Sequence, residues 1–184
     1  MIFEPSDIPD VIKITPKRYS DDRGYFVELF RDDLFRKHAG NVSFVQHNQS
    51  LSRRVGTIRG LHFQAPPAAQ GKLVRCVRGA IFDVAVDLRR SSPTFGRHIS
   101  IELTGDRDTQ LWIPAGFAHG FCTLAPDTEV WYAVTHGYNP QSEGGIIWND
   151  PALGIAWPSV ASADTLSEKD TRLGPLSDLP RIFP

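Results

Sequence analysis

Apolar and polar residues alternate along much of this chain with a period of two. The clearest example is residues 80–88, where Phe82, Val84 and Val86 fall on one side and Asp83 on the other. Successive side chains of a strand point to opposite faces, so this pattern predicts β-structure. Asp83 shares its inward-looking face with Ile and Ala residues, and a buried carboxylate there needs a partner.

Short strands of this kind follow one another at regular spacing. We predict a hairpin of residues 73–77 and 80–88 joined across Arg78-Gly79. Further strands are predicted at residues 11–14, 25–30, 44–50, 58–59, 99–103, 111–113, 117–124, 129–135 and 145–148. Many short strands separated by Gly and Pro turns favour a sandwich or barrel over a parallel sheet.

One convincing helix is predicted in the first half of the chain. Asp32 could cap its N-terminus, and Gly40 would end it. The helix would run through Leu34, Phe35 and His38. From residue 151 onward the chain is rich in Pro, Ser, Asp and Leu, which predicts an irregular tail with a short helix, wrapped on the surface of the barrel. There is no internal repeat and no linker, so residues 1–184 are expected to form a single domain with a sizeable core.

Composition and charge exclude some classes of function. The chain has 20 basic and 21 acidic residues and a net charge of -1, which gives no argument for nucleic acid or a membrane surface as a partner. No apolar run approaches the roughly 18–20 residues of a membrane-spanning helix, and the N-terminus does not resemble a secretory signal. Cys76 and Cys122 lie in apolar strand patterns, which predicts two buried free thiols in a reducing cytoplasm.

Several candidate catalytic residues lie in or near residues 59–64, Arg-Gly-Leu-His-Phe-Gln. His62 is a candidate base, while Arg59 and Lys72 supply two cations in the same local hairpin. A second histidine, His119, closes the segment Pro-Ala-Gly-Phe-Ala-His. A lone histidine in a strand is usually structural, but the surroundings of these two favour a functional role.

The pattern Pro-x-Gly-x-x-His resembles the second motif of the cupin superfamily, whose fold is a jelly-roll β-barrel. In metal cupins the first motif carries His-x-His and then a Glu. Here that motif would be His62-Phe63-Gln64, and no Glu follows at the expected distance. Two imidazoles without a third protein ligand make a poor metal site. We therefore expect a mainly β, cupin-type barrel with a few short helices and no metal.

The resemblance can be narrowed to the dTDP-4-dehydrorhamnose 3,5-epimerase family. The segments that carry it run in order across nearly the whole chain: residues 22–28, 44–48, 59–64, 70–75, 82–89, 92–96, 112–121 and 166–170. This family converts dTDP-4-dehydro-6-deoxy-D-glucose into its L-rhamno isomer, a step of dTDP-L-rhamnose biosynthesis, by inverting C3 and C5. Both carbons flank the C4 ketone, so a base on one face, an acid on the other and a cation at the enolate oxygen suffice. The resemblance implies no cofactor.

By this resemblance His62 is the base and Asp170 orients it. Tyr132 is the acid on the opposite face, and Lys72 lies where the family stabilises the enolate oxygen. His119 would line the sugar pocket, with Asp83 as its suggested partner. Further substrate contacts are implied for Arg23, Arg59 and Lys169 at the diphosphate or nucleotide, for Tyr138 stacked on thymine, and for Glu28, Gln46, Asn48 and Glu143.

Members of this family are homodimers. The resemblance therefore implies that the N-terminal strands are exchanged across a dimer. Arg23, Phe26 and Glu28 would then reach the partner's site. Without the resemblance, Arg23 could merely pair with Asp21 or Asp22.

Three alternatives remain open on the sequence. A close one is a relative that epimerises C3 or C5 only, for an unusual deoxysugar. A metal-dependent cupin oxygenase belongs to a different class, and the absent His and Glu argue against it. A sugar-nucleotide-binding or storage cupin without catalysis is the third.

Overall fold

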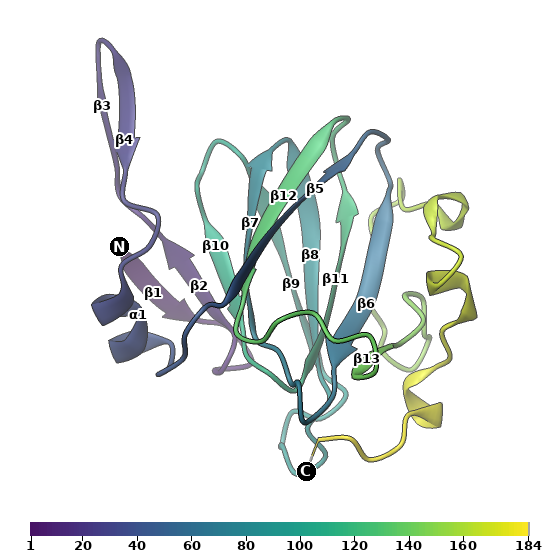
Figure 1. Cartoon of the computed structure of the whole chain (residues 1–184). Coiled ribbons are helices and arrows are strands. Elements are labelled where there is room, and N and C mark those ends of the chain that lie inside the picture. The colour runs from purple at the N-terminus through teal and green to yellow at the C-terminus, as the bar shows by residue number, and fades with distance from the viewer. Residues whose placement is uncertain (184) are drawn as a thin grey trace.

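Residues 1–183 of the computed structural model form two facing β-sheets, an N-terminal extension and a C-terminal tail (Figure 1). The strands are β1 (Ile2–Pro5), β2 (Ile12–Thr15), β3 (Arg18–Asp21), β4 (Gly24–Val27), β5 (Gln46–Ser52), β6 (Ile58–Gln64), β7 (Lys72–Arg78), β8 (Ala80–Asp87), β9 (His98–Thr104), β10 (Gln110–Ile113), β11 (Phe117–Thr123), β12 (Thr128–Val134) and β13 (Glu143–Gly145). The helices are α1 (Asp32–His38) and the 3₁₀ turns η1 (Ala163–Thr165), η2 (Asp170–Arg172) and η3 (Leu176–Asp178). No helix within residues 1–183 is long and apolar enough to cross a membrane.

The two sheets give the jelly-roll architecture that the sequence predicted. One sheet has the order β1-β2-β10-β7-β12-β5 and the other β13-β6-β11-β8-β9, with antiparallel neighbours in both. Consecutive strands often belong to different sheets, so the chain crosses repeatedly between the two layers. The sheets face each other, as Figure 1 shows for β12 and β8.

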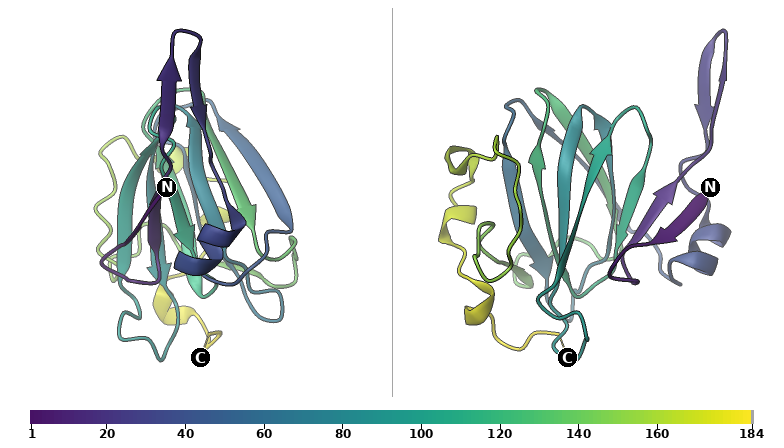
Figure 2. Two further views of the ribbon diagram at one scale, coloured as in Figure 1. Left: turned by 90° about the vertical axis from the view of Figure 1, so that its left-hand side faces the viewer. Right: turned by 180° about the vertical axis from the view of Figure 1, so that it is seen from behind.

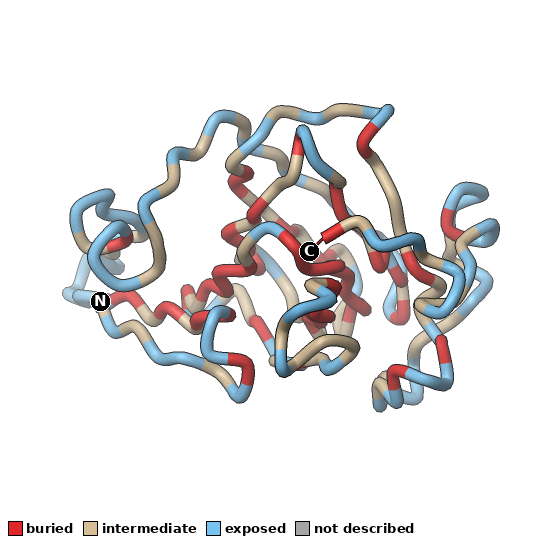
Figure 3. The backbone as a smooth tube through the Cα atoms, turned by 90° about the horizontal axis from the view of Figure 1, so that it is seen from below, coloured by how far each residue is buried: buried red, intermediate tan, exposed pale blue. Residues whose placement is uncertain are grey.

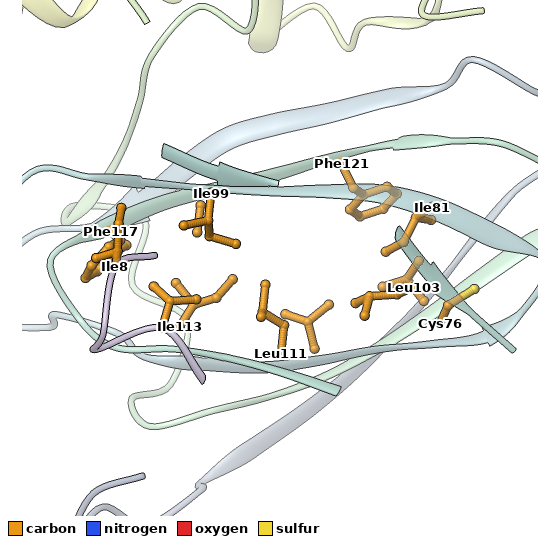
Figure 4. Close-up of a cluster of buried hydrophobic side chains, with 13 residues drawn as sticks. Ile8, Cys76, Ile81, Ile99, Leu103, Leu111, Ile113, Phe117 and Phe121 are labelled. Atoms are coloured by element: carbon orange, nitrogen blue, oxygen red, sulfur yellow. The ribbon is translucent and has the colours of Figure 1, made fainter. Parts of the chain in front are cut away.

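The main core lies between the two sheets. Ile81 and Ala85 of β8 belong to the same buried cluster as Leu111, Ile113 and Phe117 from β10 and β11. Figure 4 shows Ile81 and Phe117 at opposite ends of this layer, with Leu111 and Ile113 between them. All five are buried. Burying such aliphatic and aromatic side chains contributes about 1.5–3 kcal/mol each, so this layer holds the barrel closed.

The outer face of each sheet is also covered, which explains why β8 is apolar on both sides. Val84 and Val86 point away from the main core and pack under the C-terminal tail, where Leu153 and Phe183 are buried. On the other sheet, α1 buries Phe35 against the outward-facing side chains. Buried segments accordingly cross the centre of the molecule, with exposed loops around them (Figure 3).

Strands β3 and β4 form a hairpin that stands clear of the barrel, on the side opposite the tail (Figures 1 and 2). The hairpin is a separate two-stranded sheet, with Arg18 opposite Val27 and Asp21 opposite Gly24. At its base the Arg18 Nε donates a 2.8 Å hydrogen bond to Asp108. We call residues 18–27 the arm.

Several element predictions need correction. The strand expected at 25–30 ends at Val27, because it pairs only with β3, which the alternation pattern did not predict. The strand expected at 145–148 is β13, residues 143–145, because only these residues pair with β6. Asp32 begins α1 but does not cap it; the N-cap residue is Arg31 and makes no side-chain capping bond. The expected short helix of the tail is three separate 3₁₀ turns.

Candidate active site

A cavity of about 480 Å³ lies between the two sheets on the side of the barrel that the tail follows. Both sheets and the tail contribute to its walls, so residues far apart in sequence meet there. The side chains that line it are Ser50, Thr57, Ile58, Arg59, His62, Lys72, His119, Phe121, Tyr132, Thr165, Ser167, Lys169 and Asp170. Seven residues proposed from the sequence are among them.

The two histidines are neighbours across strands β6 and β11. His62 lies directly opposite His119 in the register of this pair. The strands approach closely because each carries a glycine: a Cβ on Gly60 would lie 2.6 Å from the Cα of Gly120. Gly60 also has a φ of 119°, which other residues rarely adopt. The glycines in the two histidine motifs therefore place the imidazoles side by side.

His62 is paired with Asp170, as the resemblance implied. Its Nε2 lies 2.5 Å from the Asp170 Oδ1, and the carboxylate is almost fully buried. Burial opposes the ionisation of Asp170, but the hydrogen bond and charge of His62, with Ser167 and Lys169, hold the pKa of Asp170 below its usual value. An ionised Asp170 accepts a hydrogen bond from the Nε2–H of His62, which leaves the lone pair on Nδ1 available as a base.

His119 is paired with Asp83, so the suggested partnership holds in the structure. Its Nε2 lies 2.9 and 3.1 Å from the two oxygens of this carboxylate. Asp83 is fully buried and His119 nearly so. The buried carboxylate on the inward face of β8 thus has the partner that its position required.

Lys72 enters the cavity from the first residue of β7, on the opposite sheet. Its Nζ donates a 3.3 Å hydrogen bond to the backbone carbonyl of His62. Burial lowers the pKa of Lys72 to about 8, although the charges of Asp83 and Glu143 oppose this shift. Lys72 is therefore mostly cationic at neutral pH and lies beside the candidate base.

Tyr132 lies on β12, in the sheet that faces His62. It is opposite Val74 of β7 and Asn48 of β5. Burial raises the pKa of the Tyr132 phenol, Arg59 opposes that shift, and the charge of Glu143 adds to it. The phenol is therefore protonated at neutral pH, which is the state that a general acid requires.

Four further predicted contacts form a connected group beside the cavity. Tyr138 donates a 3.1 Å hydrogen bond from its hydroxyl to Glu143, which is ion-paired with Lys169. Gln46 accepts the Tyr138 backbone N–H at 2.9 Å and donates to Asn48 at 2.8 Å. Burial opposes ionisation of Glu143, but Lys169 and Tyr138 hold its pKa below the usual value.

Arg23 and Phe26 of the arm, and Glu28 directly after it, do not line this cavity. Arg23 forms an ion pair with Asp21 in its own hairpin, as the simpler interpretation of the sequence allowed. Phe26 and Glu28 are exposed, and 69% of Phe26 is accessible. Within one chain, the structure does not bring these three residues to the candidate site.

Two tail residues that line the cavity with Asp170 were not predicted from the sequence, Thr165 and Ser167. Thr165 accepts a 3.0 Å hydrogen bond from the Ile58 backbone N–H and so ties the tail to the start of β6. Ser167 accepts a 3.2 Å hydrogen bond from the Asp170 backbone N–H. The signal was the spacing Ser-x-x-Asp, which is typical of a capped turn. No group of three or more His, Cys, Asp or Glu arranged to hold a metal ion occurs among residues 1–183.

The fold and the cavity define a jelly-roll protein of cupin type, in which a His–Asp pair and a tyrosine from the facing sheet line one cavity. Comparisons with known proteins identify the family. A family model described as dTDP-4-dehydrorhamnose 3,5-epimerase matches residues 5–178. The protein of that name from Sinorhizobium fredii (strain NBRC 101917 / NGR234) is 52% identical over 183 residues, covering 100% of this chain and 93% of the relative.

Solved structures agree with this match. An epimerase from Legionella pneumophila, crystallised in complex with dTDP-4-keto-L-rhamnose, has a TM-score of 0.91 at 40% identity and covers 97% of this chain and 94% of its own. ChmJ, a 3'-monoepimerase from Streptomyces bikiniensis in complex with dTDP-quinovose, has a TM-score of 0.88 at 37% identity, with coverage of 94% and 87%. The chain belongs to the dTDP-4-dehydrorhamnose 3,5-epimerase family.

Proposed function

We propose that this protein inverts C3 and C5 of dTDP-4-dehydro-6-deoxy-D-glucose to give dTDP-4-dehydro-L-rhamnose, in dTDP-L-rhamnose biosynthesis. One observation carries the proposal: His62 with Asp170, and Tyr132 on the facing sheet, line the same cavity. The names of its relatives support the same substrate. Epimerisation at one carbon only is less well supported, because the 3'-monoepimerase is the more distant relative at 37% identity.

The proposed mechanism uses each of these side chains once per carbon. His62 takes the proton from C3 or C5 on one face of the sugar, and Asp170 stabilises the imidazolium that forms. The electron pair moves to the C4 oxygen, where the Lys72 ammonium stabilises the enolate. Tyr132 returns a proton to the same carbon from the opposite face, which inverts it. Each inversion leaves the number of protons on the sugar unchanged. His62 then loses its proton to solvent and Tyr132 regains one from solvent, which restores both side chains for the second carbon.

The nucleotide end of the substrate would lie beside this cavity. Besides Lys72, the cavity is lined by the cations Arg59 and Lys169, whose side chains suit diphosphate oxygens. Tyr138 is exposed and would stack on thymine, while Glu143, Gln46 and Asn48 would complete the contacts. His119 would contact the sugar from beside His62.

We also propose that the protein is a homodimer in which the arm of one subunit reaches the partner's cavity. The arm stands clear of its own barrel, pairs with no other strand within residues 1–183, and exposes Tyr19, Tyr25 and Phe26. Exposed aromatic side chains on a projecting hairpin are typical of an interface. Arg23 and Glu28 would then complete the partner's site.

Subunit mixing tests this arrangement. Neither His62→Ala nor Arg23→Ala should be active alone, because each would lack one half of the site. A mixed dimer would contain one site with both defects and one intact site, so mixing the two variants should restore activity. No recovery after exchange of subunits would contradict the exchanged arm. We further propose residence in the cytoplasm, since the buried Cys76 and Cys122 are free thiols.

The proposed reaction is tested by incubation with dTDP-4-dehydro-6-deoxy-D-glucose in heavy water, without added metal. Mass spectrometry and NMR should find deuterium and inversion at both C3 and C5. Label and inversion at one carbon would identify a single-carbon epimerase instead. No label at either carbon, with binding intact, would identify a sugar-nucleotide-binding cupin without catalysis.

A further inference from the structure

Three glutamines hold the backbone of residues 136–139, the part of the β12–β13 connection that carries Tyr138. Gln70 donates a 2.6 Å hydrogen bond to the carbonyl of His136. Gln64 donates to the carbonyl of Gly137 at 3.2 Å and accepts the Asn139 N–H at 2.8 Å. The Tyr138 N–H is bound by Gln46. Each residue of this segment thus has a backbone group fixed by a side-chain amide.

Gln64 is the central member of this set. It is the last residue of β6, is 4% exposed, and makes a third bond by donating to the Ala68 carbonyl at 2.9 Å. It therefore joins two loops, residues 65–69 and 136–142, to the end of the strand that carries His62. In the sequence it occupies the place where metal cupins have their second histidine.

A carboxamide suits this position because it offers two N–H donors and a carbonyl acceptor at once. A neutral imidazole has one donor and one acceptor, so a histidine at position 64 would leave a backbone group without a partner. Buried backbone groups without hydrogen bonds are costly. The conformation of both loops therefore depends on the three hydrogen bonds of Gln64.

We propose that Gln64 is a positioning residue for nucleotide recognition: it fixes the segment that presents Tyr138, and takes no part in proton transfer. This inference rests on the proposed function, in which Tyr138 stacks on the base. The side chain of Tyr138 is exposed, and its one hydrogen bond within residues 1–183 is to Glu143. Its location therefore depends mainly on the backbone that the glutamines hold.

The substitution Gln64→Met removes all three hydrogen bonds at similar side-chain length. The dissociation constant for TDP and the KM should rise by about tenfold, a typical loss for stacking of one base. The kcat should change by less than about threefold, since the His62–Asp170 pair is untouched. Gln141→Met is the matched control, because Gln141 lies in the same connection and its side-chain amide makes no hydrogen bond within the described residues.

A double-mutant cycle separates positioning from a general structural role. In a Tyr138→Ala background, Gln64→Met should have little further effect on TDP affinity, because the side chain that it positions is gone. Additive losses, or a fall in kcat with unchanged TDP affinity, would overturn the proposal.

If Gln64→Met does not fold, Gln70→Met removes the single bond to His136 and should give a smaller rise that likewise disappears with Tyr138→Ala. A rise that persists in that background would contradict the proposal. TDP binding does not require turnover. A wild-type protein that binds TDP but does not epimerise the sugar would therefore contradict the proposed reaction alone.

Discussion

Two histidine–aspartate pairs have their histidines on neighbouring strands of one sheet, β6 and β11, and they differ in what surrounds them. In the pair His62–Asp170 the histidine side chain is 26% exposed to the cavity and the aspartate comes from the tail. In the pair His119–Asp83 both side chains are almost fully buried and lie on adjacent strands β11 and β8. The same two residue types therefore occupy an open site and a closed one.

The difference indicates a division of roles. His62 keeps one ring nitrogen free toward the cavity, while a single carboxylate oxygen holds the other. His119 faces both oxygens of Asp83, which fixes its orientation more completely. A base must reach its substrate, whereas a buried pair is better suited to shape the wall and to hold a charge near Lys72. We therefore expect proton transfer at the open pair.

The largest expected effect separates the two histidines. His62→Ala should lower deuterium exchange at C3 and C5 by about 10⁴-fold, the upper range for loss of a general base. His119→Ala should lower kcat/KM by only about tenfold and should also reduce the melting temperature, because Asp83 is left without its buried partner. Exchange rates by NMR and melting by calorimetry would measure both. Comparable exchange losses in the two variants would contradict the division of roles.

The aspartates should differ in the same direction. Asp170→Asn should lower kcat by about 10³-fold, because the amide cannot stabilise the imidazolium of His62. Asp83→Asn should instead lower the free energy of unfolding by about 1–3 kcal/mol, since a buried hydrogen-bonded carboxylate is lost. Urea denaturation and steady-state kinetics test the pair together. A stable Asp83→Asn protein with kcat as low as that of Asp170→Asn would reverse the assignment.

The closed pair illustrates how much of the fold the sequence could predict. Asp83 lies in a strand whose alternation is clear, and burial of its face required a partner. Most strands of both sheets were predicted from such patterns, because period-two alternation is a local signal, but the edge strand β1 was not. β3 and the true end of β4 were missed, since the arm has no buried face and therefore no apolar alternation.

The open pair illustrates what local patterns could not predict. Asp170 lies 108 residues from His62 and follows an irregular tail, so only the family resemblance joined them. The roles of Tyr132 and Lys72 depended on the same resemblance. Thr165 was missed because a hydroxyl that binds the edge of a strand carries no distinctive spacing in the sequence. The roles themselves stay predictions until the variants are measured.

Substitution of Tyr132, the proposed general acid on the facing sheet, tests whether the His62–Asp170 pair can remove protons without it. Tyr132→Phe should lower formation of inverted product by about 10²-fold, a moderate loss for one general acid. Exchange of the C3 and C5 protons should persist, because the His62–Asp170 pair is intact and can return deuterium to the face from which it took the proton. NMR of product and recovered substrate in heavy water would show label with retained configuration. Unchanged inversion would remove Tyr132 from its role.

The smallest effect concerns Lys72, whose charge lies near both pairs. Its pKa is lowered to about 8, so the ammonium is lost as the pH rises through 8. We therefore expect kcat/KM to fall by about tenfold between pH 7 and pH 9, as stabilisation of the enolate weakens. Lys72→Arg keeps its charge at these pH values and should lack this decline. A pH–rate profile of both proteins is the measurement.

Stability should change with the opposite sign over a higher range of pH. Because the folded-state pKa of about 8 is below the usual 10.5, the unfolded chain binds the proton more strongly between these values. The contribution of Lys72 to the free energy of unfolding is therefore unfavourable below pH 8 and recovers as the pH rises toward 10.5. Lys72→Met should remove this rise. Activity and stability could instead decline together above pH 8, to the same extent in the wild type and in Lys72→Met. That result would indicate general alkaline unfolding and would contradict the role of Lys72.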